Sequence, residues 1–272
     1  MEFRPVHPEF GVEVTGFDLA RASDPAEIAE LVRAYDEHSL LLFRGGESLS
    51  HARHEEVASW FGPPGPVDNL GNGAFVTVLD NKDAAGSVPL PFHSDQTYTH
   101  DPIRSICLQA IALPDAPTST TFVSGIAAWA ALPDDLKARL EGKTLRHVLD
   151  KSATGMDWPT FVADHPVKYI SERSGRPILL VTEHHATRIL EIDEAESDAV
   201  LQELYSYLYA PERRYEHVWQ EGDLLVWDNM ALQHARTAQS DPGEGRRALQ
   251  RVALCNSTLP ELIEIARARE AA

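Results

Sequence analysis

Two histidines and one aspartate in this sequence could together hold a metal ion. His93 and Asp95 are two residues apart, so on an extended chain their side chains point to the same side. Residues 223–229 read as a buried strand that ends in turn-forming residues, and His234 follows them. Two imidazoles and one carboxylate on one face of a metal leave the opposite face open, as in the facial triad of non-haem Fe(II) oxygenases.

Three arginines stand close together near the end of a chain that is otherwise poor in cations. They are Arg246, Arg247 and Arg251. Arg247 and Arg251 are four residues apart, so on a strand both face one side, whereas Arg246 faces the other. An inward-facing arginine needs an anion, and a dicarboxylate bound through paired N–H donors would supply one. For Arg246 we expect an ordinary ion pair with an acidic side chain.

Composition restricts the partners that the chain could bind. Its 272 residues include 42 acidic and 24 basic ones, a formal net charge of −18. Such a surface repels nucleic-acid phosphates and anionic lipids, so we expect a small-molecule substrate and neither nucleic acid nor a membrane as partner. Cys107 and Cys255 lie far apart in apolar stretches, which predicts buried, reduced thiols. The N-terminus does not resemble a signal peptide and no apolar run could cross a bilayer, which predicts a cytoplasmic protein.

Helix-like and strand-like segments are mixed along the whole chain without a repeat or a low-complexity linker. This pattern predicts one α+β domain over residues 1–272. Apolar spacing and capping residues predict helices at 24–37, 50–60, 126–140, 194–209 and 260–269. Short apolar runs predict strands at 40–43, 75–79, 105–111, 120–123, 177–181, 224–227 and 249–255, with a hairpin around Gly175. Without regular βαβ alternation, the sheets should be largely antiparallel.

The order of the motifs resembles one known family, the taurine dioxygenase and phenoxyacetate dioxygenase family of Fe(II)- and 2-oxoglutarate-dependent oxygenases. The similar segments are Gly11–Gly16, His93-Ser94-Asp95-Gln96-Thr97-Tyr98, Thr120–Gly125 with Ile126-Ala127-Ala128-Trp129, His165-Pro166-Val167, Arg188-Ile189, Trp219–Asp223, Trp227-Asp228-Asn229, and Arg247 with Arg251. The resemblance covers nearly the whole chain. It implies a double-stranded β-helix, or jelly roll, with flanking helices.

Carried over position by position, the resemblance also implies a catalytic site. His93, Asp95 and His234 would be the ligands of Fe(II). Arg247 and the hydroxyl of Thr120 would bind the distal carboxylate of the cosubstrate 2-oxoglutarate, and Arg251 would lie near the substrate or support the cosubstrate. Two departures accompany these roles. Thr118-Ser119 replaces the glycine pair that usually precedes the threonine, with Thr121 adjacent, and the loop at 240–245 is longer than usual.

The implied reaction oxidises a C–H bond of the substrate, while 2-oxoglutarate and O₂ give succinate and CO₂. Because Asp95 is retained, hydroxylation is favoured over halogenation, which in this superfamily accompanies loss of that carboxylate; desaturation, ring formation and heteroatom oxidation stay open. Taurine-specific members place a histidine and an asparagine where this chain reads Pro63–Val67 and Val88–Pro91. These segments argue against taurine, and we expect a small anionic or zwitterionic metabolite.

Two other functions compete with this interpretation. Two histidines and an aspartate can hold Zn²⁺ in a hydrolase, although Arg247 and Arg251 would then have no explanation. A jelly roll can also bind a ligand without a metal. The sequence leaves the oligomeric state open, although dimers and tetramers are common in the family, and a homo-oligomer would fit.

Several further residues near these motifs have competing interpretations. In Glu183-His184-His185, consecutive strand residues would face opposite ways, so at most one histidine could reach the iron. Whether His184 or His185 contacts the substrate or lies in a solvated loop stays open. Asp228-Asn229 is expected to shape a turn. His100 and His165 are expected to be structural or surface residues, and Trp219 and Trp227 are expected to be core residues.

Overall fold

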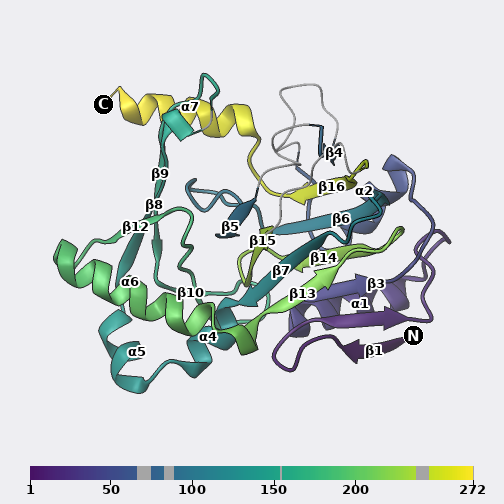
Figure 1. Ribbon diagram of the computed structural model, residues 1–272, viewed down its shortest axis with the longest axis horizontal. Coiled ribbons are helices and arrows are strands. Elements are labelled where there is room, and N and C mark those ends of the chain that lie inside the picture. The colour runs from purple at the N-terminus through teal and green to yellow at the C-terminus, as the bar shows by residue number, and fades with distance from the viewer. Residues whose placement is uncertain (66–74, 83–88, 154, 237–244, 272) are drawn as a thin grey trace.

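The structure, a computed structural model, describes residues 1–65, 75–82, 89–153, 155–236 and 245–271 (Figure 1). Its core consists of two β-sheets that face each other. The larger sheet has, in order, β1 (Glu2–Pro5), β2 (Val12–Thr15), β3 (Leu40–Phe43), β14 (Leu224–Asp228), β6 (Ser105–Ala112), β16 (Ala248–Leu254) and β4 (Val76–Asp80). The smaller sheet has β13 (Tyr215–Val218), β7 (Ser119–Ser124), β15 (Leu232–Arg236) and β5 (Leu90–His93).

The strands at the centre of the larger sheet are buried on both faces. In β3, Leu40 and Leu42 pack toward the smaller sheet, whereas Leu41 and Phe43 pack against the helices on the other side. These helices are α1 (Pro25–His38) and α2 (His51–Ser59). The alternation of side chains along a strand therefore places apolar residues on both faces, which explains why this segment is apolar without interruption.

The outer face of the smaller sheet is covered by a second group of elements. The helices are α4 (Gly125–Ala131), α5 (Asp134–Leu140) and α6 (Glu194–Leu208). Beside them lie a three-stranded sheet, β12 (Ala186–Ile189), β8 (Thr144–Leu149) and β9 (Phe161–Pro166), and the hairpin of β10 (Lys168–Ile170) and β11 (Pro177–Leu179). The helix α7 (Leu259–Glu270) packs on Phe161 of β9 (Figure 1). Short 3₁₀ turns occur at Lys151–Ala153 and Pro211–Arg213.

This architecture is the predicted α+β jelly roll with flanking helices. Among the described strand pairs, only β2 and β3 run parallel, and Cys107 and Cys255 are both buried, as expected. The single helix predicted at 126–140 is wrong, because the chain forms α4 and α5 separately. Leu132 and Pro133 between them are extended, since the residue before a proline is disfavoured in the helical conformation. No helix in the described part of the chain is long and apolar enough to cross a membrane.

Candidate active site

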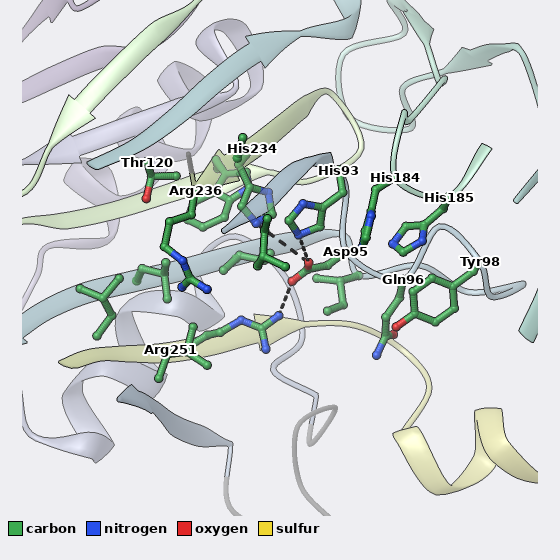
Figure 2. Close-up of a pocket in the computed structure, with 18 of the residues that line it drawn as sticks. His93, Asp95, Gln96, Tyr98, Thr120, His184, His185, His234, Arg236 and Arg251 are labelled. Atoms are coloured by element: carbon green, nitrogen blue, oxygen red, sulfur yellow. Dashed lines mark hydrogen bonds and ion pairs between the residues drawn. The ribbon is translucent and has the colours of Figure 1, made fainter. Parts of the chain in front are cut away.

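The structure brings His93, Asp95 and His234 together where β5 and β15 pair. His93 is the register partner of His234, and Asp95 follows β5 by two residues. One potential ligand atom from each residue lies within 4.8 Å of the other two. The Oδ1 atom of Asp95 is 3.1 Å from Nε2 of His93 and 3.9 Å from Nε2 of His234. The three side chains predicted from residue spacing thus converge on one point, as Figure 2 shows.

The protonation states of these groups suit a divalent metal. The Nδ1–H of His93 donates to the carbonyl oxygen of Pro91 at 2.8 Å, which leaves Nε2 to face the site. Burial and the neighbouring His93 lower the pKa of His234 to about 3, so this imidazole is neutral. Although burial opposes ionisation of Asp95, its hydrogen bond with His93 and the charge of Arg251 hold the pKa of Asp95 below the usual range. Two imidazole nitrogens and one carboxylate are a suitable donor set for iron.

The backbone of Asp95 is held by a residue that sequence reasoning had assigned only to a turn. The Oδ1 atom of Asn229 accepts the backbone N–H of Asp95 at 2.9 Å. Its Nδ2 donates to the carbonyl oxygens of Asp95 at 3.1 Å and Ile103 at 2.8 Å. The neighbouring Asp228 does shape the turn, because its Oδ1 accepts two backbone N–H groups. Asn229 therefore fixes the main chain that carries a proposed metal ligand.

The two inward-facing arginines line the same cavity, and each has a distinct environment. Arg251 donates to Oδ2 of Asp95 at 2.6 Å. Arg247 is only 2% exposed; its Nε donates to Thr118 at 2.9 Å, and its buried Nη1 has no hydrogen-bond partner among the described residues. Burial, together with the charge of Arg236, lowers the pKa of Arg247 to about 10. Arg246 forms the expected ion pair on the surface, with Asp80.

Thr120 lines this cavity and is oriented by a tryptophan. The indole Nε1–H of Trp219 donates to the hydroxyl oxygen of Thr120 at 3.0 Å. Because this bond uses an acceptor position of the hydroxyl, the O–H of Thr120 is available to donate to a ligand. Trp219 was expected to be a core residue; it is buried and also makes this polar contact. Thr118, which replaces a glycine of the family pattern, supports Arg247.

These residues line one cavity of about 350 Å³ between the two sheets. We call one part the arginine half; it is formed by Thr120, Arg236, Arg247 and Arg251. We call the other part the aromatic half; it is formed by Tyr98, Leu149, Trp158, His184, His185 and Leu259. In Figure 2 the labelled residues of the two halves lie on opposite sides of His93 and His234. The three converging residues thus separate a cationic region from a largely apolar one.

Both His184 and His185 face this cavity, contrary to the strand-based argument. Residues 183–185 form a turn, so the alternation of a strand does not apply to them. The ring centroids of His184 and His185 lie 5.8 and 6.4 Å from that of His93, and His185 also contacts Tyr98. Burial and the neighbouring His184 lower the pKa of His185 to about 3. Neither belongs to the metal-binding group found in the described residues.

Sequence reasoning missed two further residues of the cavity. Gln96 has a φ of +61°, an uncommon conformation for a residue other than glycine, and its buried Oε1 has no hydrogen-bond partner among the described residues. Arg236 lies two residues after His234 on β15 and is 8% exposed. The same alternation that paired His93 with Asp95 would have placed Arg236 on the inner face. His165 and His100 are structural and exposed, respectively, as expected.

Comparison with known proteins gives the same interpretation as the geometry. The model of the family described as "Taurine catabolism dioxygenase TauD, TfdA family" matches residues 2–253. The chain belongs to this family. It is an Fe(II)- and 2-oxoglutarate-dependent dioxygenase that acts on a small molecule.

Relatives of this TauD/TfdA family member have several names. An (S)-phenoxypropionate/alpha-ketoglutarate-dioxygenase of Sphingobium herbicidovorans is 30% identical over 87% of this chain and 89% of its own length. Pentalenolactone F synthase of Streptomyces avermitilis is 30% identical over 89% of this chain and 90% of its own. A taurine dioxygenase structure from Burkholderia xenovorans shares the fold, with a TM-score of 0.80, 24% identity and coverage of 94% of this chain and 91% of that one.

Two sequence-based expectations for this TauD/TfdA family member fall partly outside the described residues. The argument against taurine depends on Pro63–Val67 and Val88–Pro91, of which Pro66, Val67 and Val88 are outside. The expanded loop at 240–245 is outside except for Gly245. The zinc hydrolase and the metal-free binding protein are not favoured, because the family is described as one of dioxygenases and the Sphingobium relative is named an alpha-ketoglutarate-dioxygenase.

Proposed function

We propose that this dioxygenase hydroxylates a small carboxylate with an apolar, ring-sized body, using His93, Asp95 and His234 as ligands of Fe(II). The observation that supports it is the geometry of one cavity, where the three ligands separate the arginine half from the aromatic half. A bound Fe(II) would use O₂ to couple the oxidative decarboxylation of 2-oxoglutarate, which gives succinate and CO₂, to the oxidation of a substrate C–H bond. Everything else in the reaction depends on how the chain positions its two organic molecules.

The arginine half would hold the cosubstrate. Arg247 offers the distal carboxylate of 2-oxoglutarate a buried Nη1 that has no acceptor in the described part of the chain, and Thr120 offers a hydroxyl proton directed by Trp219. Charge-assisted hydrogen bonds of this kind are strong when shielded from water. Arg251 keeps Asp95 ionised through their ion pair and lies beside the metal site, where the carboxylate of a substrate could approach it.

The aromatic half would hold the body of the substrate. Its Tyr98, Leu149, Trp158 and Leu259 exclude water from the bond to be oxidised and provide flat, apolar contacts. One relative is named for phenoxypropionate, a carboxylate with an aromatic ring. His184 and His185, which are neutral at pH 7 because burial lowers their pKa values, would hydrogen-bond polar atoms near that ring.

An anaerobic titration tests the metal and cosubstrate roles. Addition of Fe(II) and then 2-oxoglutarate to the wild-type protein should produce a visible metal-to-ligand charge-transfer band, and His234→Ala should lose it. A zinc hydrolase would give no band, and its activity would not depend on O₂. Succinate release in the presence of aryloxy and aliphatic carboxylates then tests the substrate class. If no acid of the panel stimulated succinate release, the proposed substrate class would be refuted.

The remaining features of the proposal concern the whole protein. We propose that residues 1–272 form one domain, because the family model spans 2–253 and the cavity receives residues from both halves of the chain. We also propose a cytoplasmic enzyme with no nucleic-acid or membrane partner, in keeping with its formal net charge of −18. Limited proteolysis would test the single domain, since two domains would be released as separate stable fragments.

A further inference from the structure

A second guanidinium group points into the cavity opposite Arg247. Arg236 lies at the end of β15 in the smaller sheet, paired with Leu90 of β5. It is two residues from His234, so both side chains lie on the inner face of the strand. Arg247 immediately precedes β16 of the larger sheet. The two arginines therefore come from facing sheets and line the same cavity.

The charges of Arg236 and Arg247 act on each other inside this cavity. Arg236, Arg247 and His234 line the same cavity, and burial together with the positive charge of Arg236 lowers the pKa of Arg247 to about 10. An anion between the two guanidinium groups would offset the repulsion of their charges. The buried Nη1 of Arg247, which has no hydrogen-bond partner among the described residues, could donate to the same anion.

The position of Arg236 indicates which anion this is. In Figure 2 its side chain extends from the strand of His234 into the space between Thr120 and Arg251, away from His184, His185 and Tyr98. A 2-oxoglutarate molecule that chelates a metal at His93, Asp95 and His234 and reaches Arg247 must cross this space. A substrate in the aromatic half would approach the metal from the other side.

We propose that Arg236 and Arg247 together bind the distal carboxylate of 2-oxoglutarate, one from each sheet. The inference rests on the function proposed above and deepens it, because it makes Arg236 a residue that selects a dicarboxylate cosubstrate. A carboxylate has about four lone-pair positions, so it can accept from two guanidinium groups and from Thr120. A guanidinium has five N–H donors, so Arg236 can hold this carboxylate together with its other contacts.

The test compares two oxo acids that differ only at the distal end. Wild type, Arg236→Gln and Arg236→Lys are loaded anaerobically with Fe(II), and the charge-transfer band is titrated with 2-oxoglutarate or with 2-oxopentanoate, which has a methyl group in place of the distal carboxylate. Arg246→Gln is the matched control, because Arg246 is an exposed neighbour paired with Asp80. Circular dichroism and the thermal midpoint establish that each variant is folded.

We expect Arg236→Gln to raise the Kd of 2-oxoglutarate by roughly ten- to a hundredfold, and to change the Kd of 2-oxopentanoate by less than about threefold. Arg236→Lys should be intermediate, because it keeps the charge but loses the planar fork. An unchanged Kd for 2-oxoglutarate in a folded Arg236→Gln protein would overturn the inference. An equal loss of affinity for 2-oxoglutarate and for 2-oxopentanoate would overturn it too. A wild type without any band would instead refute the proposed function.

Discussion

The two halves of the cavity are built from different kinds of structure. The arginine half comes from strands of facing sheets, where Thr120 of β7 pairs with His217 of β13 and Arg236 of β15 pairs with Leu90 of β5. In the aromatic half, His184 and His185 lie on a turn, Trp158 lies in a loop and Leu259 begins α7. Loops tolerate change more readily than the strands of a core. In the proposed arrangement, a cosubstrate shared by a whole family would meet the rigid part, and a substrate that differs among its members would meet the adaptable part.

The largest effect should follow from removing the buried cation of the arginine half. We expect Arg247→Ala to weaken 2-oxoglutarate binding by at least about a hundredfold, because the truncation of one partner of a buried charge pair costs several kcal/mol. The anaerobic charge-transfer titration measures this Kd. Added guanidinium ion should restore part of the affinity in the vacated space. An unchanged affinity of Arg247→Ala for 2-oxoglutarate would show that the arginine half does not bind the cosubstrate as proposed.

The backbone of Asp95, at the boundary between the halves, can be disturbed by a substitution at a residue that is not itself a proposed metal ligand. Asn229→Ala removes the three hydrogen bonds that hold the backbone of Asp95 and Ile103. We expect the affinity for Fe(II) to fall by roughly ten- to a hundredfold, the range for residues that orient metal ligands. Asn229→Asp should be equally impaired, since a carboxylate cannot donate to the two carbonyl oxygens.

The control for Asn229 is Asn256→Ala, because Asn256 is exposed. Fe(II) titration and the thermal midpoint should be measured on the same samples. If Asn229→Ala lowers the thermal midpoint but binds Fe(II) as wild type does, then Asn229 stabilises the fold and does not position Asp95.

Alternation along strands made much of the arginine half predictable from the sequence. Residues an even number of positions apart on a strand face the same side. This rule alone placed His93 with Asp95 and Arg247 with Arg251, and the structure brings each pair into the same cavity. Arg236 follows the same rule, because it lies two residues after His234. It was missed because residues 232–236 were not recognised as a strand. Their sequence, Leu-Gln-His-Ala-Arg, lacks a run of β-branched or aromatic residues, and the strand forms through pairing with β5 and β7.

The contacts that local patterns could not predict are those between distant segments. Asn229 lies 134 residues from Asp95, and nothing in the turn around Asn229 indicates which backbone its amide will meet. The aromatic half was equally hidden, because Trp158 and Leu259 belong to irregular or terminal segments whose placement depends on packing against β8 and β9. Pro133, in contrast, was a local signal that should have divided the predicted helix.

A substitution in the aromatic half should weaken substrate binding and leave 2-oxoglutarate binding unchanged, which is the reverse of the effect expected for Arg247→Ala. We expect Trp158→Ala to raise the KM of an aryl carboxylate by roughly tenfold, because it removes apolar and aromatic contact area. The Kd of 2-oxoglutarate should stay within about twofold of wild type, since Trp158 lies away from the arginines. Steady-state succinate release gives the first value and the charge-transfer titration the second. A parallel loss in both would indicate that the halves are coupled.

The last expected effect is on stability and not on ligand binding, and it concerns the residues that pack behind the aromatic half. His147 on β8 is fully buried, faces His165 with His185 and Asp164 nearby, and neither of its ring nitrogens has a hydrogen-bond partner among the described residues. Burial lowers its pKa to about 3, whereas in the unfolded chain it would titrate near 6.5. Because the unfolded state binds the proton more readily, this residue destabilises the fold as pH falls from about 6.5 toward 3, by about 2 kcal/mol at pH 5.

His147→Leu should therefore reduce the loss of stability between pH 7 and pH 5, because leucine has no site for a proton. Urea unfolding at the two pH values measures the difference, and His100→Gln, at an exposed position, is the control. A His147→Leu protein as acid-sensitive as wild type would contradict this account.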